Sequence, residues 1–84
     1  MAAIAYSKDA LKVLKRMPAN AAALVRSKIA DYAANPSGLA NNVKALRGDG
    51  ADLRLRVGDW RVLMAIESDR LIVVKIGPRG SIYD

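Results

Sequence analysis

The spacing of apolar residues predicts two helices in the first part of the chain. In Lys8–Arg16, Leu11 and Leu14 fall on one side of a helix, Met17 continues that side, and basic residues occupy the other. A second helix is predicted over Ala19–Ala34, with an apolar stripe of Ala22, Val25, Ile29 and either Tyr32 or Ala33. Because so few residues join the two helices, we expect them to form an antiparallel hairpin.

The second part of the chain has the two-residue period of β-strands. Leu53, Leu55 and Val57 alternate with Arg54 and Arg56, which predicts a strand with one apolar and one basic face. Turn-forming pairs at residues 58–59 and 68–69 separate two further predicted strands, Trp60–Glu67 and Arg70–Ile76.

The remaining segments complete a β-α-α-β-β-β order. Ala2–Tyr6 is a short apolar run that predicts a first strand, and Ser7 is a candidate N-cap for the helix that follows. Residues 35–38 are turn-forming, and a loop is expected through Val43–Gly48. Gly and Pro at residues 77–78 interrupt the last strand, after which residues 81–83 add a short extended piece. We therefore predict a single α+β domain over residues 1–84, an antiparallel sheet packed against an N-terminal helical hairpin.

Composition excludes several classes of function. The 84 residues include neither Cys nor His, which removes thiolate nucleophiles, the commonest general base and the commonest metal ligand. The carboxylates are scattered over turns and termini, so no metal site is expected. No apolar run approaches the ~18 residues of a membrane span, and a soluble cytoplasmic protein is expected. The net charge of +6 favours an anionic partner such as nucleic acid or an acidic protein, with solubility alone as the alternative interpretation.

The predicted hairpin concentrates arginines on one face of the sheet. A two-residue turn at residues 58–59 pairs Val57 with Trp60 and puts Arg56 directly opposite Arg61, with Arg54 on the same face. Like charges across a strand pair cost roughly a few tenths of a kcal/mol each. A polyanion would offset that cost, because arginine binds phosphate oxygens with a bidentate fork. A solvated strand face that carries Lys and Arg is the alternative interpretation.

The C-terminal segment adds candidates to this cluster. The third strand is expected to return beside the start of the second, which would bring Arg79, and with it Tyr83, toward Arg61. Packing near the terminus is the alternative role for Tyr83, and Trp60 is interpreted as a core residue. The basic residues of the first helix form either a solvated face or an extension of a nucleic-acid surface: Lys8, Lys12, Lys15 and Arg16.

The same residues carry a family resemblance. The segments 43–48 (VKALRG), 52–64 (DLRLRVGDWRVLM) and 76–83 (IGPRGSIY), together with the order of elements, resemble the RelE/ParE toxin superfamily over nearly the whole chain. The resemblance implies a bacterial type II toxin held inactive by a cognate antitoxin. RelE-type members are mRNA interferases, endoribonucleases that cut mRNA in the ribosomal A site without a metal or another cofactor.

Residue roles follow from this resemblance. Arg61 matches the arginine that contacts the scissile phosphate, Arg79 the arginine of the tail, and Tyr83 the proposed general base. Arg54 and Arg56 match positions that are lysines in the best-known RelE toxin, so here they are expected to bind phosphate without exchanging a proton. Lys44 and Arg47 are further candidates for binding phosphate or RNA.

Two alternative functions stay open at this point. ParE-type members of the superfamily share the fold and inhibit DNA gyrase, and a third possibility is an inactive relative that only binds an antitoxin. The partners implied are therefore an antitoxin protein and either mRNA in the ribosomal A site or gyrase.

Overall fold

The computed structural model describes residues 3–47 and 50–82. Its helices are α1 (Lys8–Arg16), α2 (Ala19–Ala34) and a 3₁₀ segment, η1 (Pro36–Asn42). The first two have the bounds predicted from the apolar spacing. The Oγ atom of Ser7 accepts a hydrogen bond of 3.0 Å from the backbone N–H of Ala10, which confirms Ser7 as the N-cap of α1.

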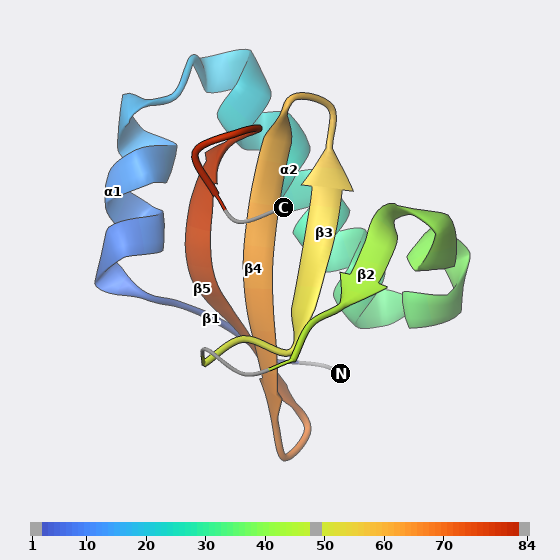
Figure 1. Ribbon diagram of the computed structural model, residues 1–84. Coiled ribbons are helices and arrows are strands. Elements are labelled where there is room, and N and C mark those ends of the chain that lie inside the picture. The colour runs from blue at the N-terminus through green and yellow to red at the C-terminus, as the bar shows by residue number, and fades with distance from the viewer. Residues whose placement is uncertain (1–2, 48–49, 83–84) are drawn as a thin grey trace.

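Five strands form one mixed sheet in the order β1-β5-β4-β3-β2 (Figure 1). They are β1 (Ala3–Tyr6), β2 (Val43–Ala45), β3 (Leu53–Val57), β4 (Trp60–Glu67) and β5 (Arg70–Pro78). Neighbouring strands are antiparallel, except that β1 pairs in parallel with β5. The predicted α+β class is therefore confirmed, and the observed order of elements is the predicted one with η1 and the strand β2 added.

The sheet differs from the expected one in three details. Strand β1 lies parallel to β5. Parallel neighbours need a long connection, and here the helices and strands β2, β3 and β4 lie between the two strands in the chain. Val43–Ala45, expected as part of a loop, pairs with β3 as a short edge strand. Strand β5 continues through Gly77 to Pro78, and Pro78 is tolerated because it occupies the last position of the strand.

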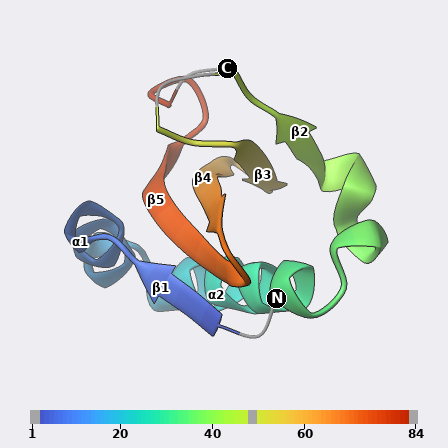
Figure 2. The same cartoon turned by 90° about the horizontal axis from the view of Figure 1, so that it is seen from below.

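The helices cover one face of the curved sheet. Helix α1 lies beside β5, and α2 runs back behind the sheet (Figures 1 and 2). The core between them includes Val25 and Ile29 from α2 and Leu55, Val62 and Met64 from the sheet, all at 0% exposure. The predicted stripe of α2 is confirmed, whereas Leu11 of α1 is 37% exposed because it lies beyond the edge of the buried stripe.

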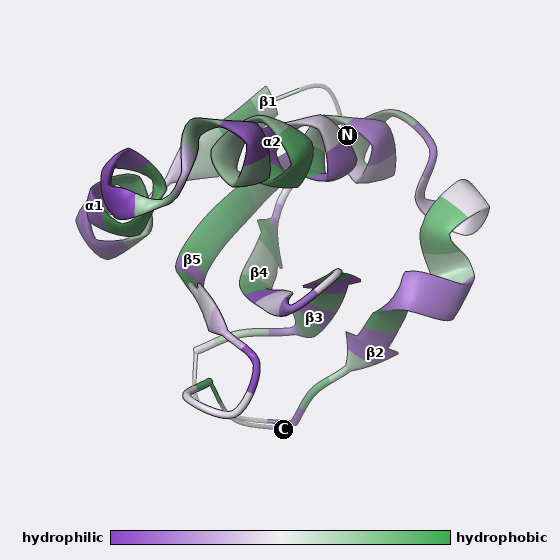
Figure 3. Cartoon of the chain, turned by 90° about the horizontal axis from the view of Figure 1, so that it is seen from above, coloured by the Kyte–Doolittle hydropathy of each residue, from purple (hydrophilic) through white to green (hydrophobic). Residues whose placement is uncertain are grey.

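The face of the sheet that the helices leave uncovered is more polar than the face that packs against them. The apolar residues of α1 face the sheet and its hydrophilic residues lie on the outer side (Figure 3). On β3, alternate residues point to the core and to the opposite face, so Leu55 and Val57 are buried while Arg56 is exposed. The face that bears the arginines is therefore the face that the helices leave uncovered.

Candidate nucleic-acid interface

The β3–β4 hairpin has the register that the turn predicts. Val57 pairs with Trp60, and Arg56 lies directly opposite Arg61. Gly58 has a φ of +58°, the left-handed conformation that glycine adopts at little steric cost in such a turn. The two residues of the turn therefore determine which arginines meet across the hairpin.

The turn also orients the guanidinium of Arg61. Its Nη1 atom donates hydrogen bonds to the backbone carbonyls of Gly58, at 2.9 Å, and Trp60, at 3.0 Å. Arg61 is half-buried, so the position of its side chain is limited by packing as well as by these bonds. A guanidinium held in this way is ordered before any ligand arrives.

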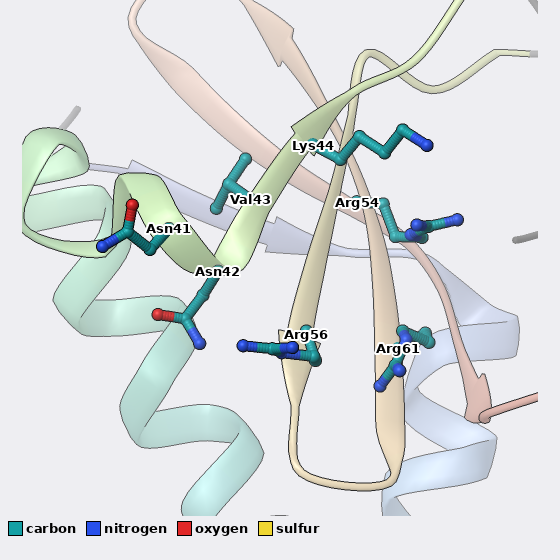
Figure 4. Close-up of a pocket in the computed structure, with 7 residues that line it drawn as sticks. All are labelled: Asn41, Asn42, Val43, Lys44, Arg54, Arg56 and Arg61. Atoms are coloured by element: carbon teal, nitrogen blue, oxygen red, sulfur yellow. The ribbon is translucent and has the colours of Figure 1, made fainter.

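Four of the predicted cationic residues come together in one hollow of about 220 Å³ (Figure 4). The edge strand β2 contributes Lys44, which pairs with Arg54 in the β2–β3 ladder. Arg56 and Arg61 form the neighbouring pair of the β3–β4 ladder. The side chains lining the hollow come from η1 and three strands: Asn41, Asn42, Val43, Lys44, Arg54, Arg56 and Arg61.

Other predicted site residues lie elsewhere. Among the described residues that line the hollow, neither Arg47 nor Arg79 is present. The backbone N–H of Arg79 donates a 2.7 Å hydrogen bond to the carbonyl of Asp59, so its backbone lies beside the β3–β4 turn while its side chain is exposed. The predicted role of Tyr83 concerns a residue outside the described ranges.

The tail after β5 folds back over the uncovered face of the sheet (Figure 1). Gly77 lies opposite Arg61 in the β4–β5 ladder. A β-carbon at Gly77 would lie 2.8 Å from Cγ1 of Ile82, which is itself only 2% exposed. Ser81 closes the turn, with both its N–H and its hydroxyl donating to the carbonyl of Pro78 at 3.1 Å. The tail is thus anchored one strand away from the arginine pair.

The two asparagines of the hollow were missed by the sequence analysis. Asn41 and Asn42 end η1, immediately before β2. Val43–Ala45 was expected to be a loop. The sequence therefore indicated no strand pairing that would place these amides near the arginines of β3. Recognising Val43–Ala45 as a strand beside β3 would have placed Asn42, the residue immediately before it, close to the arginines of β3.

The basic side of α1 does not belong to this cluster. Helix α1 packs against β5, whereas the hollow lies over β2, β3 and β4. All four basic residues of that side are exposed, as an amphipathic surface helix requires: Lys8, Lys12, Lys15 and Arg16.

No three Asp or Glu side chains gather in a way that could hold a metal ion within residues 3–47 and 50–82. In the same ranges, no helix has the length and apolar character needed to cross a membrane. The functional groups of the hollow are guanidiniums, one ammonium and amides, which together suit a ligand rich in hydrogen-bond acceptors such as a phosphodiester.

Fold and hollow together define a class, a small α+β protein with a cationic cleft on the helix-free face of its sheet. Among solved structures, the chain is similar to the archaeal RelE–RelB complex of Pyrococcus horikoshii OT3, with 24% identity, a TM-score of 0.79 and coverage of 98% of this chain and 100% of that one. The RelB–RelE antitoxin–toxin complex of Methanococcus jannaschii matches with 25% identity, a TM-score of 0.73 and 95% coverage of both chains.

The likeness extends to a toxin without its partner. The isolated E. coli RelE toxin matches with a TM-score of 0.75 and 14% identity, covering 94% of this chain and 85% of that one. Neither the protein-family models nor the curated proteins give a match. The chain has the RelE toxin fold, as the resemblance of its sequence segments predicted.

Proposed function

We propose that this chain is the toxin of a type II toxin–antitoxin system and acts as a ribosome-dependent endoribonuclease on mRNA. The observation that carries the proposal is the convergence of Arg54, Arg56 and Arg61 with Lys44 in one hollow. The RelE fold of the chain supports the same function.

The proposed reaction needs no nucleophile from the protein. The 2′-oxygen of a ribose attacks the adjacent phosphorus, and the bond from phosphorus to the 5′-oxygen of the next nucleotide breaks. The proton of the 2′-hydroxyl goes to a base, and the leaving 5′-oxygen takes up a proton. The products are a 2′,3′-cyclic phosphate and a 5′-hydroxyl, which is consistent with a chain that has no His and no Cys.

The arginines would act on the charge that develops at phosphorus. An additional negative charge forms on the phosphate oxygens in the transition state, and preorganised donors stabilise it most effectively. Arg61 suits this role because the turn carbonyls already orient its guanidinium. Arg54 and Arg56 would bind the phosphate and hold the substrate in line for attack.

The proposal assigns the proton transfers to the C-terminal segment. Arg79 would stabilise charge at the leaving group, and Tyr83 would act as general base for the 2′-hydroxyl. A phenol has an ordinary pKa of about 10, so action as a general base would require cationic groups that favour the phenolate. We expect cleavage of free RNA to be slow, since the ribosome supplies the in-line orientation of the substrate.

An antitoxin is the expected protein partner. The solved structures from P. horikoshii and M. jannaschii are complexes of RelE with RelB. By analogy, we propose that an antitoxin covers the sheet and helices of this chain and blocks or displaces the arginines. Its gene is expected to lie beside that of the toxin.

The test is to map RNA 5′-ends after induced expression of the chain and of Arg61→Ala. The proposal predicts new mRNA ends at A-site codons with the unaltered chain and their loss with Arg61→Ala. Arg61→Lys, which keeps the charge without the bidentate fork, is expected to give an intermediate rate. Lys12→Ala is the matched control, because it removes a cation from exposed α1, outside the hollow.

Three results would contradict the proposal. The first is persistent mRNA cleavage by folded Arg61→Ala. The second is DNA breakage with intact mRNA, the signature of gyrase poisoning. The third is induction of the unaltered chain without any growth defect, which would indicate an inactive relative that only binds an antitoxin.

A further inference from the structure

The side chain of Asn42 lies beside Arg56 in the lining of the hollow (Figure 4). The β2–β3 ladder begins with Val43 opposite Leu55, and Asn42, the last residue of η1, comes immediately before it in the chain. Arg56 in turn pairs with Arg61 in the β3–β4 ladder.

The orientation of Asn42 supports this placement. Its amide is directed toward the guanidinium of Arg56, whereas the amide of Asn41 points away from the arginines (Figure 4). Both asparagines line the hollow, but Asn42 is half-buried and Asn41 is exposed. Of the two amides, that of Asn42 is therefore the better placed for a ligand bound on the arginines.

An amide adds a chemistry that the cations lack. Guanidinium and ammonium groups only donate hydrogen bonds, and phosphate oxygens accept them. An amide both donates and accepts, so it can pair with a group that presents an acceptor beside a donor. Asparagine makes such a bidentate contact with N7 and the N6 amino group of adenine. In single-stranded RNA, proteins read the exposed edges of unstacked bases in this way.

We propose that Asn42 is the base-recognition residue of the hollow and favours adenine next to the phosphate that the arginines bind. This inference rests on the proposed function and deepens it, because it assigns a base preference to the RNA substrate. The arginines hold the phosphodiester, and Asn42, beside Arg56 in the same lining, contacts the adjacent base.

Binding of short oligonucleotides tests the inference separately from catalysis. We would titrate the purified full chain into fluorescently labelled 2′-O-methyl pentanucleotides of A or of U and record anisotropy. The 2′-O-methyl group blocks the proposed cleavage, so only binding is measured. The unaltered chain is expected to bind the A oligonucleotide at least about 5-fold more tightly than the U oligonucleotide.

The substitutions separate base recognition from phosphate binding. Asn42→Ala is expected to bring the A-to-U affinity ratio close to one while leaving U binding within about 2-fold. Asn42→Asp keeps an acceptor but adds a negative charge, so it is expected to lose the preference and weaken binding of both oligonucleotides. Arg56→Gln is expected to weaken both and retain the ratio. Asn20→Ala, an exposed asparagine in the first turn of α2, is the matched control.

The outcomes distinguish this inference from the function on which it rests. An unchanged A-to-U ratio in folded Asn42→Ala overturns the inference, whether or not the unaltered chain cuts mRNA. Equal binding of both oligonucleotides by the unaltered chain also overturns it. Loss of the preference in Asn42→Ala, together with absence of mRNA cleavage by the unaltered chain, supports the base contact and contradicts the nuclease. Failure to bind any oligonucleotide also overturns the inference, whereas the nuclease itself is tested by the mapping of mRNA ends.

Discussion

Ile82 packs over Gly77 so closely that a β-carbon on Gly77 would lie 2.8 Å from its Cγ1 atom and 2.9 Å from its Cδ1 atom. Gly77 is also the residue opposite Arg61 in the β4–β5 ladder. The absence of a side chain at residue 77 thus lets the tail lie against the face of the sheet that bears the arginines. Together with the hydrogen bond from the Arg79 N–H to the Asp59 carbonyl, this contact fastens the tail to the strands that carry the arginines.

Gly77→Ala is therefore expected to displace the tail. The new methyl group overlaps the side chain of Ile82, and overpacking at a buried site costs about 1–3 kcal/mol. If the tail supplies catalytic groups as proposed, the rate of cleavage falls by more than the loss of stability alone would explain. Urea denaturation monitored by circular dichroism measures the loss of stability, and a cleavage assay measures the loss of activity.

A double-mutant cycle checks that Ile82 is the cause. Ile82→Ala removes the overlapping atoms, so the combination Gly77→Ala with Ile82→Ala is expected to lose less stability than the sum of the two single changes. The coupling should be about 0.5–3 kcal/mol. Strict additivity would show that the loss of stability in Gly77→Ala comes from a contact other than the one with Ile82.

The arginine pair of the hairpin predicts opposite effects on stability and on binding. Arg56 is exposed and faces Arg61, and like charges directly opposite one another destabilise a strand pair. Arg56→Gln should therefore raise the free energy of unfolding by about a few tenths of a kcal/mol and weaken binding of single-stranded RNA. Lys12→Gln removes the same charge from α1 and should weaken RNA binding less. An equal loss in both variants would mean that net charge, and not the hollow, governs binding.

Salt dependence reports how many cations meet the RNA backbone. If the four cationic residues of the hollow each neutralise one phosphate, the slope of log K against log salt concentration should be about −3 for single strands. Arg56→Gln should make the slope less steep by about 0.7. Anisotropy titrations over a series of salt concentrations give both slopes, and an unchanged slope would place Arg56 outside the RNA contact.

Ser7 connects α1 to the sheet through a single hydroxyl. Its Oγ atom accepts from the N–H of Ala10 and donates to the carbonyl of Val74 at 2.6 Å. Ser7→Ala removes both bonds and is expected to cost about 1–2 kcal/mol of unfolding free energy, whereas Ser7→Thr should recover most of it. Ser37→Ala, which removes only an exposed hydrogen bond to Asn35, is the control for urea denaturation.

Local pattern was enough to predict most of the elements. The 3.6-residue and two-residue periods predicted α1, α2, β3 and β4 with the bounds observed, because each of these elements buries one face in a single core. The two-residue turn at 58–59 likewise predicted the pairing of Arg56 with Arg61, since turn length determines the register of a hairpin. These features depend on residues near one another in the chain.

Long-range pairing was decided by the tertiary structure. Val43–Ala45 is too short to show a period and becomes a strand only because β3 offers it an edge. This pairing also brings Asn42, the residue before β2, into the same hollow as Arg56. The parallel pairing of β1 with β5 joins residues nearly seventy positions apart, and no local signal specifies it.

The sequence by itself thus determined the α+β class, the basic strand face and the opposed arginines, because periodicity and turn length act over a few residues. Only the tertiary structure decided which residues share the hollow. It brought Lys44 and Asn42 to the arginines, left Arg47 and the side chain of Arg79 outside the lining, and anchored Ile82 on Gly77. The physical reason is that the hollow lies where strands from separate parts of the chain meet. Burial of the whole core determines which of these strands are neighbours.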